Sequence, residues 1–135
     1  MRGPAAVSVC VSGRVIRGYR RARLVGFPTA NIELSLPLDA PEGSYVGWAR
    51  VGTEQTRHAA LAFYGIPHAI EGALKPRLEV HLLGRSDDIY GESIELELVS
   101  FLRPNQQFKT EDELTAAIHN DFEMAQNFFS SKSNP

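Results

Sequence analysis

A chain of 135 residues, of which 43% are hydrophobic and 22% charged, has the composition of one globular domain, which we expect to span residues 1–135. No run approaches the ~18 apolar residues of a membrane span, and the N-terminus lacks a signal-peptide pattern. A single cysteine, Cys10, excludes an internal disulfide, and we expect its small side chain to be buried. These features favour a cytoplasmic enzyme or binding module with no membrane partner.

Charge is unevenly distributed along the chain. The formal net charge is only −2, but residues 1–32 contain six arginines and all 16 acidic residues lie beyond them. A basic first third on an acidic body predicts a local anion site. A nucleic-acid contact through residues 14–23 is the alternative. Net acidity and the lack of exposed-looking aromatic residues interleaved with the arginines argue against it, so we expect no nucleic-acid partner.

Alternating and β-branched segments predict six strands. In chain order they are residues 7–16, 29–34, 44–51, 58–64, 77–83 and 93–102. A basic loop follows the first strand, a turn-rich connection over 37–43 precedes the third, and a long loop over 65–76 follows the fourth. The fifth strand alternates most clearly, with Leu78 and Val80 on one face and Glu79 and His81 on the other.

The sequence changes to a helical period near its end. Thr110 and Glu113 have the spacing of a capping box. An apolar stripe then recurs at helical spacing through Leu114, Ala117, Ile118, Phe122, Ala125 and Phe129. Six strands followed by one amphipathic helix predict a small antiparallel barrel with the helix packed against it. We expect an ordered core over about 7–129 and a frayed tail over 130–135.

Residues 26–31 carry the clearest chemical pattern. Thr29 and Asn31 have the i, i+2 spacing that places two oxygens on one face of a strand. The guanidinium groups of Arg20, Arg21 and Arg23 lie close by in sequence. This pattern indicates a site for phosphate and a hard metal ion. The alternative is a turn entering a strand, with Asn31 serving only the backbone.

Several segments together resemble the riboflavin kinase (flavokinase) family. They are residues 13–18, 26–31, 43–48, 79–83, 89–91 and 101–104, then Phe108 and the segment around Ile118, Asp121 and Ala125. The resemblance implies a six-stranded antiparallel Greek-key barrel with a C-terminal α-helix. It implies transfer of the γ-phosphoryl group of ATP to the ribityl 5′-hydroxyl of riboflavin, which produces FMN. It also implies a monofunctional module without the adenylyltransferase domain of FAD synthetases.

The resemblance assigns roles to single residues. Thr29 and Asn31 correspond to the magnesium-side residues, for Mg²⁺ or another divalent ion, and Glu79 corresponds to the catalytic base. For Glu79 the alternative is a solvated strand carboxylate paired with Arg77 or with a cation on a neighbouring strand. His81, on the same strand face, is a rival base whose expected role is packing or hydrogen bonding around the site.

The phosphates of ATP are expected to lie against the loop before the second strand. The nucleotide-binding residues implied there are Gly18, Arg20, Arg21, Arg23, Gly26, Pro28 and Thr29. The family loop is rich in glycine, whereas this chain has Arg20 and Ala22 at such positions. The arginines either compensate for the missing glycines by binding phosphate through charge-assisted hydrogen bonds, or they form a solvated basic loop.

Arg103 and Phe108 are the residues expected to border the isoalloxazine ring, although Phe108 could instead dock the helix. Residues 61–67 also depart from the family, which has a Ser-Ile-Gly element there. The expected partners are riboflavin or FMN and ATP or ADP, bound by a monomer. The alternative function is a degenerate kinase module that binds flavin or nucleotide without catalysis.

Overall fold

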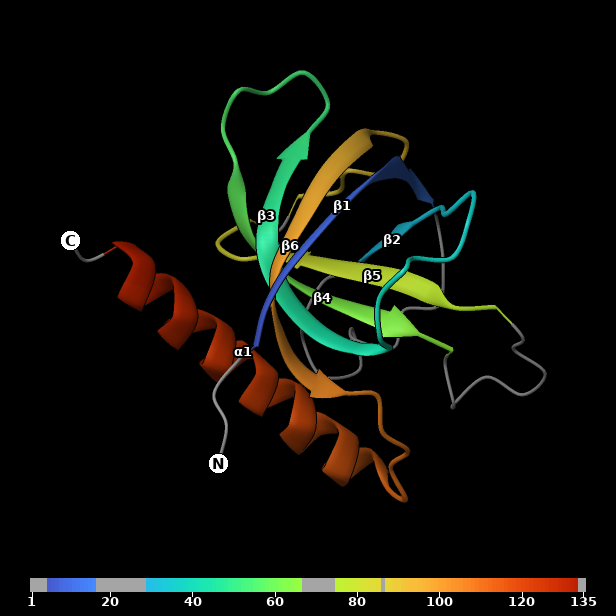
Figure 1. Ribbon diagram of the computed structural model, residues 1–135, viewed down its shortest axis with the longest axis vertical. Coiled ribbons are helices and arrows are strands. Elements are labelled where there is room, and N and C mark those ends of the chain that lie inside the picture. Colours follow the sequence, from blue (N-terminus) through green and yellow to red (C-terminus); the bar gives the residue numbers. More distant parts are fainter. Residues whose placement is uncertain (1–4, 17–28, 67–74, 86, 134–135) are drawn as a thin grey trace.

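The computed structural model describes residues 5–16, 29–66, 75–85 and 87–133. These residues form six strands and one helix (Figure 1): β1 (Ala5–Ile16), β2 (Ala30–Ile32), β3 (Gly43–Val51), β4 (His58–Gly65), β5 (Arg77–Leu82), β6 (Ser93–Pro104) and α1 (Glu111–Ser133). Each predicted strand is present, and so is the predicted helix. Within the described residues, no helix combines the length and apolar composition needed to cross a membrane.

The strands close into an antiparallel barrel in the spatial order β1-β2-β5-β4-β3-β6, with β6 paired to β1. β3, β4 and β5 are consecutive neighbours, and β6 returns to lie beside β3. This arrangement is a Greek key, so the predicted fold is confirmed. Closure pairs both edges of every described strand, which removes the exposed edges that promote aggregation.

The barrel interior follows the period-2 alternation of the sequence. Leu78 and Val80 of β5 are almost fully buried, as are Tyr45 of β3 and Tyr64 of β4. Burial of the Tyr45 ring raises the pKa of its phenol. The Tyr64 hydroxyl accepts a hydrogen bond from the Leu38 N–H at 2.9 Å, which ties the connection before β3 to the barrel wall.

The expectation that Cys10 is buried is wrong. Val9 and Val11 of β1 pack against the interior core. Cys10 lies between them on the opposite strand face and is exposed. Alternation along a strand outweighs the general preference of cysteine for burial, because neighbouring side chains must point to opposite faces.

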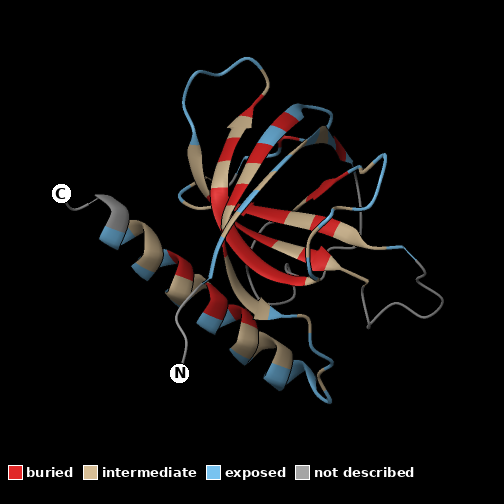
Figure 2. Cartoon of the chain, in the orientation of Figure 1, coloured by how far each residue is buried: buried red, intermediate tan, exposed pale blue. Residues whose placement is uncertain are grey.

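The helix α1 lies across the outside of the barrel against β3 and β4 (Figure 1). A second apolar cluster forms between them around Val46, Leu61 and Ala125, whose side chains are fully buried. Figure 2 shows the buried positions of α1 on the side that faces the barrel. The helix therefore covers the outer face of the sheet where that face is apolar.

The start of α1 has the predicted cap. The Thr110 Oγ1 accepts a hydrogen bond from the Glu113 N–H at 3.1 Å. The Glu113 carboxylate in turn accepts a hydrogen bond from the Lys109 N–H at 3.4 Å. These bonds satisfy amide groups that a helix start leaves without partners. The helix ends at Ser133, beyond the position at which we expected the polar tail to fray.

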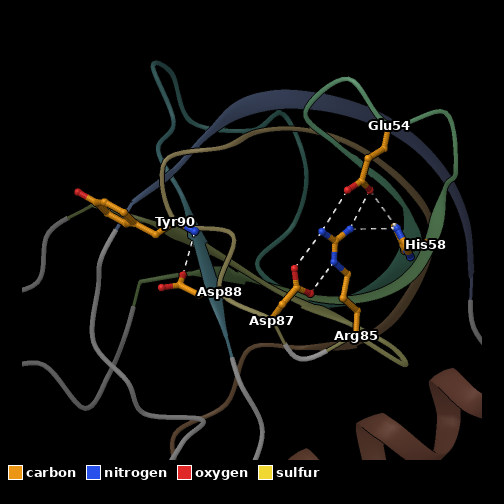
Figure 3. Close-up of polar contacts among 6 residues, drawn as sticks. All are labelled: Glu54, His58, Arg85, Asp87, Asp88 and Tyr90. Carbon is orange, nitrogen blue, oxygen red and sulfur yellow. Dashed lines mark hydrogen bonds and ion pairs between the residues drawn. The ribbon is translucent and has the colours of Figure 1, made fainter.

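One end of the barrel is closed by an ion-pair network centred on Arg85 (Figure 3). This is the end where β3 and β5 terminate and β4 and β6 begin. The guanidinium donates to Glu54 at 2.8 and 3.1 Å and to Asp87 at 2.7 and 3.1 Å. Arg85 holds the pKa of both carboxyls below their usual values. The network links the β3–β4 turn to the segment before β6.

Candidate active site

A cavity of about 260 Å³ opens at the opposite end of the barrel, where β3 and β5 begin and β4 and β6 end. Its walls come from these strands, from the connection between β6 and α1, and from the first turns of α1. The apolar lining includes Phe63, Ile66, Phe108, Leu114 and Ile118. The polar lining includes Arg77, Glu79, His81, Arg103 and Asn105. An apolar cavity with a few polar groups is typical of small-molecule sites.

The structure brings together two of the predicted site residues from separate strands. β2 pairs with β5 so that Asn31 and Glu79 are directly opposite each other. Residues so paired in an antiparallel ladder share one face of the sheet, with Cβ atoms ~4.5–5.5 Å apart. Their neighbours Ile32 and Leu78 fill the barrel core, so Asn31 and Glu79 lie on the outer face. Glu79 lines the cavity, and Asn31 lies directly opposite it on β2.

Two side-chain oxygens at or next to β2 are buried and have no hydrogen-bond partner in the described part of the chain. The Thr29 Oγ1 and the Asn31 Oδ1 have no hydrogen-bond partner among the residues that the structure describes. Asn31 as a whole is only 7% exposed. A buried polar atom without a partner costs free energy, so native proteins seldom keep one without a reason. Thr29 and Asn31 also have the i, i+2 spacing that directs two side chains to one face.

These two oxygens suit a hard cation. Mg²⁺ prefers oxygen ligands and is held by few protein groups together with water and substrate phosphates. In the described part of the chain, no three His, Cys, Asp or Glu side chains gather to hold a metal ion. The neutral oxygens of Thr29 and Asn31 are of the kind that Mg²⁺ accepts, so the residues present fit such an ion.

Glu79 is one of the polar side chains that line the cavity. Its side chain is half-buried and lines the cavity, with Asn31 opposite on β2 and Phe63 opposite on β4. His81 follows on the same strand face, with its ring 5.8 Å from that of Phe63 and 5.1 Å from that of Phe122. The histidine ring thus packs between a strand aromatic and a helix aromatic, which agrees with a packing role.

One residue of the cavity lining, Arg103, forms an ion pair with a buried carboxylate. Arg103 donates to the two carboxylate oxygens of Asp121 at 2.8 and 2.6 Å, and the Ser44 hydroxyl donates to the same carboxylate at 3.3 Å. Asp121 has no solvent exposure. Burial raises the pKa of Asp121, although Arg103 and Ser44 act in the opposite direction. The pair fastens the end of β6 to α1.

Arg103 and Phe108, the two residues predicted to border a flavin, both line the cavity. The guanidinium carbon of Arg103 lies 5.9 Å from the centre of the Phe108 ring, a cation–π distance. Because Asp121 takes two of the Arg103 N–H groups, the planar guanidinium is held at a fixed place beside Phe108. A planar ligand would meet two preformed flat groups here.

The remaining predicted residues belong to the loop that we expect to contact the phosphates of ATP. Gly18, Arg20, Arg21, Arg23, Gly26 and Pro28 all lie outside the described residues. Sequence reasoning gave no role to Ser44 and used Asp121 only as part of a resemblance. A signal for Asp121 was present, because an acidic residue stands within the apolar stripe between Ile118 and Ala125. A carboxylate on the buried face of a helix requires a cationic partner.

The fold and the cavity define a small-molecule-binding Greek-key barrel with a flanking helix. The profile of the Flavokinase family, described as riboflavin kinase, matches residues 6–129. The chain is 33% identical over 119 residues to the riboflavin kinase of Mus musculus, which covers 84% of this chain and 76% of that protein. The chain therefore belongs to the riboflavin kinase family, as its sequence motifs indicate.

Two further comparisons agree with this membership. The chain is 36% identical over 121 residues to the bifunctional riboflavin kinase/FMN adenylyltransferase of Haemophilus influenzae, covering 90% of this chain and 39% of that protein. It thus spans less than half the length of this bifunctional relative. A crystal structure of riboflavin kinase from Trypanosoma brucei has the same fold, with a TM-score of 0.64, 19% identity, and coverage of 96% of this chain and 82% of that chain.

Proposed function

We propose that this protein transfers the γ-phosphoryl group of ATP to the ribityl 5′-hydroxyl of riboflavin, producing FMN and ADP. The observation that supports this most is the direct pairing of Asn31 with Glu79 at the wall of the cavity. The pairing sets Glu79 opposite Asn31, and the buried side-chain oxygens of Asn31 and nearby Thr29 lack hydrogen-bond partners among the described residues. Membership of the riboflavin kinase family supports the same reaction.

Glu79 is the proposed catalytic base. The ribityl hydroxyl is a weak nucleophile, and a carboxylate within hydrogen-bond reach orients it and accepts its proton as the new P–O bond forms. The bond from the γ-phosphorus to the bridging oxygen of ATP breaks, and ADP leaves with that oxygen. A positioned base of this kind contributes roughly 10²–10⁴ in rate.

Thr29 Oγ1 and Asn31 Oδ1 are the proposed ligands of Mg²⁺ or another divalent ion, which when bound neutralises charge on the triphosphate. The fit rests on two buried oxygens of the kind that magnesium prefers. The proposed nucleotide-binding set is Gly18, Arg20, Arg21, Arg23, Gly26, Pro28 and Thr29.

The flavin ring is proposed to lie against Phe108 and the guanidinium plane of Arg103. Leu114 and Ile118 of α1 add apolar surface to the same cavity. This placement leaves the ribityl tail to extend along the wall toward Glu79. The isoalloxazine ring suits such a site because its two faces are apolar and its polar atoms lie along its edge.

The proposal is tested by incubating the purified protein with riboflavin, ATP and Mg²⁺ and separating FMN by chromatography. We expect FMN from the wild type and a loss of roughly 10²–10⁴ in turnover for Glu79→Gln, with riboflavin binding retained. Glu97→Gln is the matched control, because Glu97 is also a half-buried strand glutamate but pairs with Arg57 away from the cavity. Riboflavin binding without FMN, under every nucleotide and metal tried, would instead favour a non-catalytic binding module.

We also propose that the protein works as a single-domain monomer in the cytoplasm. Size-exclusion chromatography with light scattering should give the mass of one chain, 14.9 kDa, at assay concentrations.

A further inference from the structure

A cluster of hydrogen bonds joins three separate segments at the mouth of the cavity. Glu42 precedes β3, Ile66 follows β4, and Asn105 follows β6. One carboxylate oxygen of Glu42 accepts from the Ile66 N–H at 2.7 Å and from the Asn105 side-chain amide at 3.2 Å. The same amide nitrogen donates to the Ile66 carbonyl at 3.4 Å. We call Glu42 and Asn105 the rim pair.

Backbone contacts reinforce the rim pair. The Asn105 N–H donates to the Glu42 carbonyl at 3.1 Å, and the Asn105 side-chain oxygen accepts from the Gln106 N–H at 3.0 Å. Asn105 therefore uses both ends of its side-chain amide and its backbone N–H. Both residues of the pair are half-buried, so water competes less for these bonds than at an open surface.

Gly65 shows how closely β4 approaches this pair. A Cβ atom at Gly65 would lie 2.6 Å from the Glu42 carboxylate and 2.7 Å from the Asn105 amide nitrogen. Such distances are shorter than van der Waals contact, so a side chain at Gly65 would displace the Glu42 carboxylate and the Asn105 amide from their present positions. The end of β4 is thus held at a fixed position relative to the rim pair.

The two segments that the rim pair joins, the end of β4 and the connection after β6, are walls of the proposed flavin site. Gly65, Ile66 and Asn105 line the cavity, and Phe108 follows Asn105 on the same connection. The rim pair therefore sets the spacing between the end of β4 and the connection that carries Phe108. A planar ring inserted between these segments is sensitive to that spacing, because dispersion contacts weaken steeply with separation.

We propose that Glu42 and Asn105 are positioning residues that fix the width of the slot for the flavin ring and so set the affinity for riboflavin. They take no part in phosphoryl transfer. This inference rests on the proposed function and adds to it the determinants of flavin affinity. A preformed slot binds more tightly because less ordering of the protein is required on binding.

The test uses a charge swap within the rim pair. Asn105→Asp places two carboxylates at hydrogen-bond distance and should raise both the KM and the fluorescence-quenching Kd for riboflavin ~10-fold. The KM for ATP and the kcat at saturating riboflavin should change less than ~2-fold, because Glu79 and the phosphate side are untouched. Adding Glu42→Gln removes one charge, restores a donor–acceptor pair, and should recover most of the riboflavin affinity.

A purely structural role would lower the Tm without this selective effect and without the rescue. Asn105→Ala, which removes the amide without adding charge, is measured in the same way in case Asn105→Asp does not fold. A folded variant with wild-type riboflavin affinity would overturn the inference while leaving the proposed reaction standing. Failure of the wild type to make FMN would instead remove the proposed reaction, and the Kd series would still test the rim pair.

Discussion

The two ends of this barrel treat their polar groups differently. At the closed end, Arg85 satisfies two carboxylates, Glu54 and Asp87, and links two connections (Figure 3). At the cavity end, the Thr29 and Asn31 oxygens are buried with no partner among the described residues. Pairing stabilises a fold, whereas a buried oxygen without a partner opposes it. Folding alone explains the closed end and leaves the cavity oxygens unexplained, which is why we place ligand chemistry there.

The cavity end also contains one fully formed pair, Arg103 with Asp121, whose carboxylate is completely buried. This pair joins β6 to α1 beneath the cavity. The closed end therefore contributes to stability alone. At the cavity end, the same residues contribute to stability and to the proposed ligand binding. Mutations can measure how far this separation holds.

The largest effect is expected for Asp121→Ala. This change leaves the Arg103 guanidinium, with 18% side-chain exposure, without its counter-ion and should cost about 3 kcal/mol in the free energy of unfolding. Urea denaturation measures the loss. Glu123→Ala, on the exposed face of the same helix, is the control. A loss no larger than that of the control would show that the pair does not fasten the helix.

Thr29→Val should separate activity from stability. The change is nearly isosteric and removes a buried hydroxyl that lacks a described partner, so the free energy of unfolding should stay constant or rise by up to ~1 kcal/mol. FMN formation should fall ~100-fold, because a proposed ligand of the divalent ion is lost. Thr53→Val, in the exposed turn after β3, is the control for the same chemical change. Unchanged turnover in Thr29→Val would contradict the metal assignment.

Arg85→Met should give the reverse outcome. Loss of the network at the closed end should lower the Tm by a few degrees, since its partners Glu54 and Asp87 are solvent-exposed. The rate of FMN formation and the KM for riboflavin should remain at wild-type values, because the cavity lies at the other end. A clear fall in activity at a temperature where the variant is folded would show that the two ends are coupled.

The smallest expected effect is on the pH dependence of the free energy of unfolding. Arg85 lowers the pKa of Glu54 and Asp87 below their usual 4.5 and 3.8, so their stabilising contribution is complete above these values. It is lost as the pH falls through the lowered values of the folded state. The wild type should therefore lose more stability on acidification than Arg85→Met, as measured by urea midpoints across a pH series. Parallel losses in the two proteins would exclude this contribution.

The strands and the helix were predictable from local pattern. Alternation at Leu78 and Val80 gave the buried face of β5, and the Thr110 cap gave the start of α1. The same alternation could have placed Cys10 outside, had it been weighed above the average burial of cysteine. Local periodicity works for these residues because each strand or helix must bury one face.

The site could not be predicted from periodicity. Asn31 and Glu79 meet only because β2 pairs with β5 in one particular register, and no local pattern specifies pairing between strands so distant in sequence. Family resemblance suggested that Asn31 and Glu79 belong to one site, and the pairing of β2 with β5 brings the two residues together. The contacts of Glu42 with Ile66 and Asn105 depend in the same way on three segments that meet only in the folded chain.

The packing of Trp48 has a practical consequence. It is the only tryptophan of the chain, and its ring packs edge-on against Phe129 of α1 at 4.9 Å between ring centres. Its fluorescence should therefore report directly whether the helix is seated on the barrel. A red shift that precedes the loss of β-sheet circular dichroism would reveal an intermediate in which the helix has detached from an intact barrel.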